Sequence, residues 1–125
     1  MKENLYKILT SQEWEISKAS GFITTELDLN DGFIHLSNAA QLSTTLALYF
    51  SHHEEVILLL PELTQVQDKL IYEAVDSQSK RSGKFGHLYA ELKVSQISKS
   101  WVLKRNAFEI PEDILIEAEM GKVAD

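Results

Sequence analysis

The sequence contains no cysteine among its 125 residues. It can therefore form no disulfide, no zinc site built from thiolates and no thiol nucleophile. It also contains no apolar stretch approaching about 18 residues, and its first residues lead into a strand-like pattern instead of a signal segment. We therefore expect a cytoplasmic protein that has no transmembrane helix and no membrane partner.

Several motifs of common enzymes are missing as well. The sequence has no glycine-rich phosphate loop, no Gly-x-Ser-x-Gly and no His-Glu-x-x-His. Positive charge is scarce, since 12 Lys and Arg stand against 19 Asp and Glu, for a net charge of −7. Such a chain is poorly suited to neutralising phosphates, so nucleic-acid binding is disfavoured. One basic cluster, 80–84, is the exception, and it is either a solvated loop or a phosphate contact.

The pattern of apolar residues predicts one domain of the α+β class. We expect about six or seven short strands with two or three helices. The strands fall at 4–9, 33–37, 55–60, 69–75, 85–94 and 101–105, with helices near 10–19 and 38–50 and a polar connector at 22–29. The domain spans 1–125, with a core at about 4–105 and a C-terminal tail at 106–125, because a chain of this length can bury a sufficient core by itself.

The stretch 31–37, Asp-Gly-Phe-Ile-His-Leu-Ser, is the most informative part of the sequence. Its first two residues predict a turn. Strand alternation then places Phe33, His35 and Ser37 on one face, with the two intervening apolar residues toward the core. Ser37 also precedes a helical pattern and suits its N-cap. His35 would then lie beside a helix N-terminus, where unpaired N–H groups can bind an anion.

A second strand of similar character follows the basic loop. If 85–94 is a strand, then His87, Tyr89 and Glu91 share one face. Two such strands side by side would form a pocket that stacks a ring and holds a ribose or phosphate. In that pocket either histidine could serve as an acid or a base, while Glu91 could act as a base or stabilise a cationic sugar.

Structural roles compete with each of these functional ones. A histidine beside aromatic residues is often a partly buried structural residue, Ser37 can serve only as a helix cap, and Tyr89 can serve only as packing. Glu91 is equally well explained as a solvent-facing strand residue. The pair at 52–53, His-His, suggests a metal, but adjacent side chains of an extended segment point to opposite sides, so we expect no metal site.

Several segments together resemble a bacterial family known as domain of unknown function 952. The resemblance runs from about residue 5 to about residue 94, and its Gly-Phe-Ile-His-Leu-Ser and Phe-x-His-Leu-Tyr segments are specific in combination. The segments that carry it are Leu5–Ile8 with the following Trp14, 31–37 with the following Gln41, and the stretches 58–60, 71–73 and 85–89.

That family is in turn remotely similar to the ADP-ribosyltransferase fold of bacterial toxins, poly-ADP-ribose polymerases and RNA 2′-phosphotransferases. The resemblance implies a split, mostly antiparallel β core that binds NAD, as a substrate, or an ADP-ribose-like nucleotide. It also implies three site positions, which fall on Lys7 in the first strand, on the strand of His35 and Ser37, and on His87 or Glu91. An ammonium at Lys7 replaces the histidine that family members often carry there.

We therefore predict an ADP-ribosyltransferase-like enzyme with a nucleotide-binding cleft. Two other functions stay open, namely a non-catalytic module that binds a nucleotide-like metabolite and a protein-interaction domain whose histidines are structural. The predicted catalytic residues are His35, His87 and Glu91, and the predicted ligand-binding residues are Tyr6, Lys7, Phe33, Ser37 and Tyr89.

Overall fold

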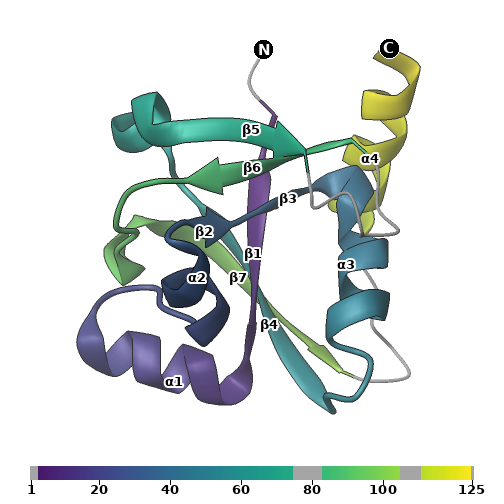
Figure 1. Ribbon diagram of the computed structural model, residues 1–125. Coiled ribbons are helices and arrows are strands. Elements are labelled where there is room, and N and C mark those ends of the chain that lie inside the picture. Colours follow the sequence, from purple (N-terminus) through teal and green to yellow (C-terminus); the bar gives the residue numbers. More distant parts are fainter. Residues whose placement is uncertain (1–2, 75–82, 105–110, 125) are drawn as a thin grey trace.

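Two antiparallel sheets form the centre of this α+β protein (Figure 1). The computed structural model describes residues 3–74, 83–104 and 111–124. The strands in these residues are β1 (Leu5–Thr10), β2 (Ile34–His35), β3 (Ser37–Asn38), β4 (Glu55–Pro61), β5 (Leu70–Ala74), β6 (Lys84–Leu88) and β7 (Ile97–Lys104). One sheet has the order β3-β1-β4-β7 and the other the order β2-β6-β5.

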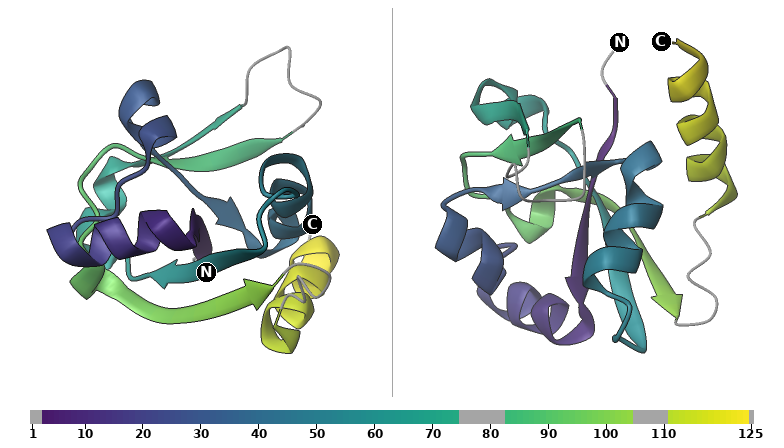
Figure 2. Two further views of the ribbon diagram at one scale, coloured as in Figure 1. Left: turned by 90° about the horizontal axis from the view of Figure 1, so that it is seen from below. Right: turned by 45° about the vertical axis from the view of Figure 1, so that its right-hand side comes forward.

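Short helices surround the sheets. The α-helices are α1 (Ser11–Ser20), α2 (Glu26–Asp31), α3 (Leu42–Tyr49) and α4 (Glu112–Ala124), and the 3-10 helices are η1 (Ala39–Gln41), η2 (Thr64–Lys69) and η3 (Val94–Gln96). As predicted, α1 begins with a capping box between Thr10 and Glu13 and ends at Gly21, whose φ of 88° suits glycine. In Figures 1 and 2, α3 and α4 lie on the same side of the molecule, where α4 packs against η1.

The core lies on both faces of the four-stranded sheet. β4 is central, between β1 and β7, and four consecutive residues, Val56 to Leu59, are buried, which confirms the predicted central strand. β1 sends alternate side chains to two clusters, as its pattern predicts. The cluster under α3 and α4 contains Tyr6, Ile8, Leu42, Leu46, Leu58 and Ile114. The cluster between the two sheets contains Leu5, Leu9, Ile34, Leu36, Leu59 and Leu88.

One extended segment, 34–38, belongs to both sheets. Its first half pairs with β6, through Ile34 opposite Leu88, and its second half pairs with β1, through Ser37 opposite Tyr6. β1 pairs with β3 only at its first two residues, whereas its remaining part pairs with β4 alone among the described strands. The two sheets therefore diverge beside β1, and this divergence positions the candidate site.

Two local predictions around this segment are wrong, and a third is confirmed. The connector predicted at 22–29 contains most of α2, because Thr25 caps a helix by accepting a hydrogen bond from the Asp28 backbone N–H. The turn predicted at Gly32 is present, with a φ of 82°, and it forms the end of that helix. The next helical segment is capped by Asn38 instead of Ser37, in a capping box with Gln41, and it starts as η1 before it continues as α3.

The later part of the chain brings two more corrections. The strand predicted at 85–94 ends at Leu88, and the chain then turns away through Glu91 to η3. The core is not confined to 4–105, because Ile114 of α4 is buried in the cluster that contains Tyr6. Most of the basic loop, 75–82, lies outside the described residues.

Candidate functional site

The structure brings the two histidines of interest together. His35 of β2 and His87 of β6 are direct partners in the ladder, so both side chains point to the same face of the three-stranded sheet. Their ring centroids are 5.5 Å apart. Both rings line a cleft of about 510 Å³ that lies beside β1, between α1, α2 and α3. Two positions distant in sequence therefore form one site.

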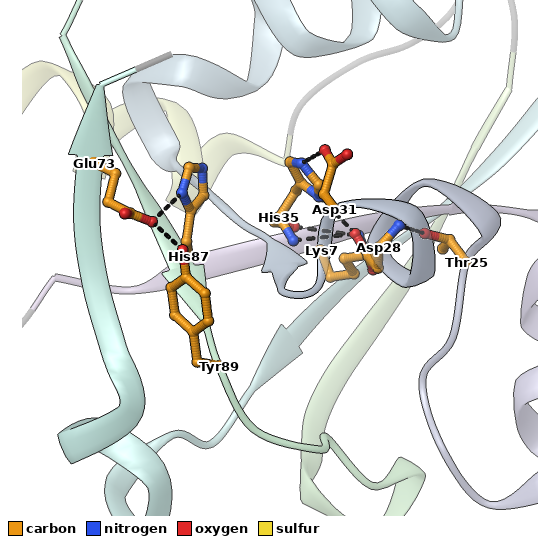
Figure 3. Close-up of polar contacts among 8 residues, drawn as sticks. All are labelled: Lys7, Thr25, Asp28, Asp31, His35, Glu73, His87 and Tyr89. Carbon is orange, nitrogen blue, oxygen red and sulfur yellow. Dashed lines mark hydrogen bonds and ion pairs between the residues drawn. The ribbon is translucent and has the colours of Figure 1, made fainter. Parts of the chain in front are cut away.

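His35 is held by three side chains, all shown in Figure 3. Its Nδ1 lies 2.7 Å from Asp28 Oδ1, and its Nε2 lies 2.9 Å from Asp31 Oδ2. Its backbone N–H also donates to Asp28, over 3.2 Å. Lys7 Nζ forms an ion pair of 2.7 Å with the other oxygen of Asp28 and donates to the His35 carbonyl. Side chains from β1, α2 and β2 thus form one network.

Asp28 is the buried centre of this network. Its side chain and that of Lys7 are each only 6% exposed. Burial acts to raise the pKa of Asp28, but hydrogen bonds from His35 and the charge of Lys7 outweigh it, so the pKa lies below its ordinary value of 3.8. Asp28 is therefore ionised at neutral pH, and it orients both cationic partners.

The contacts of His35 also define its protonation state. An ionised carboxylate only accepts hydrogen bonds, so Asp28 and Asp31 can both be bonded to the ring only if both ring nitrogens carry a proton. His35 is then an imidazolium between two carboxylates. Together with Lys7, the network contains two positive and two negative charges, so its net charge is zero.

His87 has a different environment. Its Nδ1 lies 2.8 Å from Glu73 Oε1, and the Tyr89 hydroxyl donates to the same oxygen over 2.7 Å (Figure 3). These hydrogen bonds, from Tyr89 first and then from His87, lower the pKa of Glu73. The hydrogen bond to Glu73 raises the pKa of Tyr89. In a neutral His87 ring that donates Nδ1–H to Glu73, Nε2 is the proton acceptor, and it has no hydrogen-bond partner among the described residues.

The predicted site residues divide between two hollows. Five of them line the main cleft, namely Tyr6, Lys7, His35, Ser37 and His87. The other three line a second hollow of about 430 Å³, namely Phe33, Tyr89 and Glu91. Phe33 stacks on His87 at 4.1 Å between centroids and lies 4.5 Å from the His35 ring, so these rings separate the two spaces.

Several of these side chains are already engaged within the protein. Tyr6 is 1% exposed, and its hydroxyl donates to Glu117 of α4. Burial and, after it, the charge of Glu117 raise the pKa of Tyr6 to about 12. Ser37 is hydrogen-bonded to Thr45 of α3 over 3.1 Å. Glu91 is exposed beyond the end of β6 and does not line the cleft of the histidines.

Three carboxylates of the site were not identified from the sequence. Asp28 lies in the segment predicted as a connector and Asp31 in the predicted turn, although Thr25, three residues before Asp28, is a helix N-cap signal. The spacing of Asp31 and His35, i and i+4, is a second signal. Glu73 lies in the strand predicted at 69–75, but its proximity to His87 follows from the pairing of β5 with β6, which the sequence does not reveal.

The described residues contain neither a cluster of metal ligands nor a membrane-spanning helix. Among the residues that the structure describes, no group of three or more His, Cys, Asp or Glu side chains is arranged to hold a metal ion. His53 instead lines the cleft, 5.8 Å from the ring of Phe50. Nor is any helix in the described ranges long and apolar enough to cross a membrane.

Comparisons with known proteins identify the family. The model of a protein family of unknown function, DUF952, matches residues 8–100. The chain is also similar to protein CC0527 from Caulobacter crescentus. The X-ray structure of that protein has 36% identity and a TM-score of 0.71, over 81% of this chain and 86% of that one. Its solution NMR structure has 35% identity and a TM-score of 0.69, over 87% and 91%. No curated protein matches. This chain therefore belongs to the DUF952 family.

Proposed function

We propose that the cleft binds NAD or an ADP-ribose-like nucleotide and that the protein is an ADP-ribosyltransferase-like enzyme. One observation carries this proposal: His35 and His87 face one cleft, 5.5 Å apart, where the two sheets diverge beside β1. The resemblance to the ADP-ribosyltransferase fold implies that the nucleotide binds where the antiparallel β core is split.

The size and lining of the cleft suit such a ligand. Its volume of about 510 Å³ lies within the range of about 300–1,000 Å³ that is usual for small-molecule sites. Apolar side chains such as Ile8, Leu27 and Phe85 form much of its wall, and a few polar groups are grouped around the histidines. A ligand with planar rings and a polar centre matches this distribution.

The two histidines take different roles in the proposed reaction. The bond between ribose C1′ and nicotinamide breaks, and its electron pair leaves with nicotinamide. A hydroxyl of the acceptor, or water, forms the new bond to C1′, and its proton passes to Nε2 of His87, which Glu73 orients through Nδ1. The charged His35 contributes binding, because an imidazolium forms strong hydrogen bonds to anionic oxygens. Glu91 lies in the second hollow, apart from the cleft of the histidines, and takes no part in this step.

A second candidate is a nucleotide-binding module without catalysis. It is favoured by the engagement of Lys7, which is paired with the buried Asp28 and therefore not available to assist a reaction. In that case His87 would serve only as a hydrogen-bond partner of the ligand.

Thermal-shift titration with NAD, ADP-ribose and nicotinamide tests binding. A ligand present at about 100 times its Kd adds about 2.7 kcal/mol to the free energy of unfolding, so the melting temperature is expected to rise by several degrees. His87→Ala should reduce this shift, whereas His52→Ala, an exposed histidine outside the cleft, should not. An unchanged melting temperature with all three compounds would contradict the proposal.

Release of nicotinamide from NAD separates the two candidates. The enzyme releases nicotinamide, and His87→Ala abolishes the release while His52→Ala retains it. Binding without release identifies the non-catalytic module.

A further inference from the structure

Asp31 occupies a position that the stability of its own helix does not explain. It is the last residue of α2, directly before Gly32, and a carboxylate at the carboxyl end of a helix opposes the helix dipole. Its side chain is 42% exposed, yet its carboxylate lies 2.9 Å from His35 Nε2 at the wall of the cleft. The contact with His35 is therefore the interaction that favours an acidic side chain at position 31.

The two carboxylates on His35 differ in how firmly they are held. Asp28 binds Nδ1 from the inside, where it is 6% exposed, receives the His35 backbone N–H and pairs with Lys7. Asp31 binds Nε2 from the side of the cleft and makes none of these additional contacts. A group entering the cleft can therefore replace Asp31 without disturbing Asp28.

The charges indicate which kind of group would replace it. Lys7, Asp28 and the doubly protonated His35 together carry one positive charge, and Asp31 cancels it. If Asp31 turns to solvent, Nε2–H of His35 faces the cleft with an uncompensated charge. An anion restores both the hydrogen bond and the charge balance, and charge-assisted hydrogen bonds of this type are strong.

We propose that Asp31 occupies an anion subsite of the cleft and that a phosphate-type group of the ligand displaces it from His35 Nε2. This inference deepens the proposed function and rests on it, since it assigns the place of the nucleotide phosphate. Asp31 then acts as an internal competitor, which weakens binding of ligands that lack an anionic group able to replace it.

The experiment uses the full chain labelled with ¹⁵N and inorganic phosphate as the probe. Binding is followed through the ring N–H signal of His35 Nε2 by NMR. Phosphate should shift this signal in the wild type and bind about tenfold more tightly to Asp31→Asn, because the competing carboxylate is gone. The matched control is Glu26→Gln, the same charge change at an exposed position of the same helix outside the cleft, and its affinity should equal that of the wild type.

Three results would overturn the inference. The first is that phosphate fails to shift the His35 signal. The second is that Asp31→Asn binds phosphate no more tightly than the wild type. The third is that Glu26→Gln binds phosphate as tightly as Asp31→Asn, which would make the effect one of overall charge. The wild-type titration answers the first point even if the variant folds poorly.

A parallel titration with ADP-ribose separates this inference from the proposed function. If phosphate binds at His35 and ADP-ribose does not bind at all, the anion subsite stands and the nucleotide proposal fails. If ADP-ribose binds equally well to the wild type and to Asp31→Asn, the nucleotide proposal stands and the displacement of Asp31 fails.

Discussion

His35 and His87 are neighbours in one ladder, but the carboxylates that hold them differ in burial. Asp28, the partner of His35, is 6% exposed and also neutralises Lys7, whereas Glu73, the partner of His87, is 39% exposed and lies on strand β5 at the surface. Similar histidine–carboxylate contacts therefore have different roles in the two places. The buried contact between Asp28 and His35 stabilises the fold. The more exposed contact between Glu73 and His87 is suited to orient His87 for a proton transfer.

The largest expected effect is on stability, in the variant Asp28→Ala. It leaves the charge of Lys7 buried without its counterion, which costs about 3–5 kcal/mol of the free energy of unfolding. Urea denaturation measures this loss. Replacing Lys7 by Met in the same chain should recover part of the stability, because the unpaired charge is then removed.

Glu73→Ala is the matched comparison for that variant, and it should cost much less, since surface ion pairs contribute little. Equal losses in the free energy of unfolding for Asp28→Ala and Glu73→Ala would contradict the different roles of the two carboxylates.

The next effect is on activity, in the variant Glu73→Gln. A glutamine amide can donate to Nδ1 of His87, and that contact favours the tautomer whose Nε2 carries the proton and cannot accept another. We expect nicotinamide release to fall about 100-fold, with the melting temperature close to that of the wild type. Tyr89→Phe keeps the contact between Glu73 and His87 and should reduce the rate less.

NMR of the His87 ring gives a readout of this variant that does not depend on turnover. In the wild type the ring proton should be on Nδ1, and in Glu73→Gln it should move to Nε2. A wild-type ring protonated at Nε2 alone would refute the assigned role of Glu73.

The smallest expected effect is a change in the free energy of unfolding at acid pH. The pKa of Asp28 is lowered in the folded state below its ordinary value of 3.8, so its contribution to stability is fully present above that value. The contribution is lost as the pH falls through the lower folded pKa. The free energy of unfolding of the wild type should therefore decline more steeply below pH of about 4 than that of Asp28→Asn. Urea midpoints between neutral pH and pH of about 3 provide the test, and parallel curves for the two proteins would contradict it.

Much of the architecture follows from local sequence. The alternation of β1, the apolar run of β4 and the capping box of α1 each occur where the pattern predicts them. Each of these signals arises from side chains within a few residues of one another, and the side-chain alternation of a strand or the cap of a helix needs no distant partner.

The site was only partly predictable. The pattern of 31–37 predicts that His35 faces away from the core, and strand alternation after the basic loop predicts the same for His87. The helix that contains Asp28 and Asp31 was missed, because a six-residue helix with little apolar periodicity lacks the signal on which helix prediction depends. Strand alternation continued past Leu88 predicts Glu91 beside His87, but the strand ends at Leu88.

Local sequence specifies which side chains can perform chemistry and on which face of a strand or helix each one lies. Which of these side chains meet is set by long-range packing. The pairing of β2 with β6 sets His35 against His87, the pairing of β5 with β6 brings in Glu73, and the packing of α2 puts Asp28 between Lys7 and His35. Strand register and helix docking are set by burial of the apolar surface of the whole chain, which brings together segments far apart in the sequence. The residues around any one segment therefore do not reveal its partner.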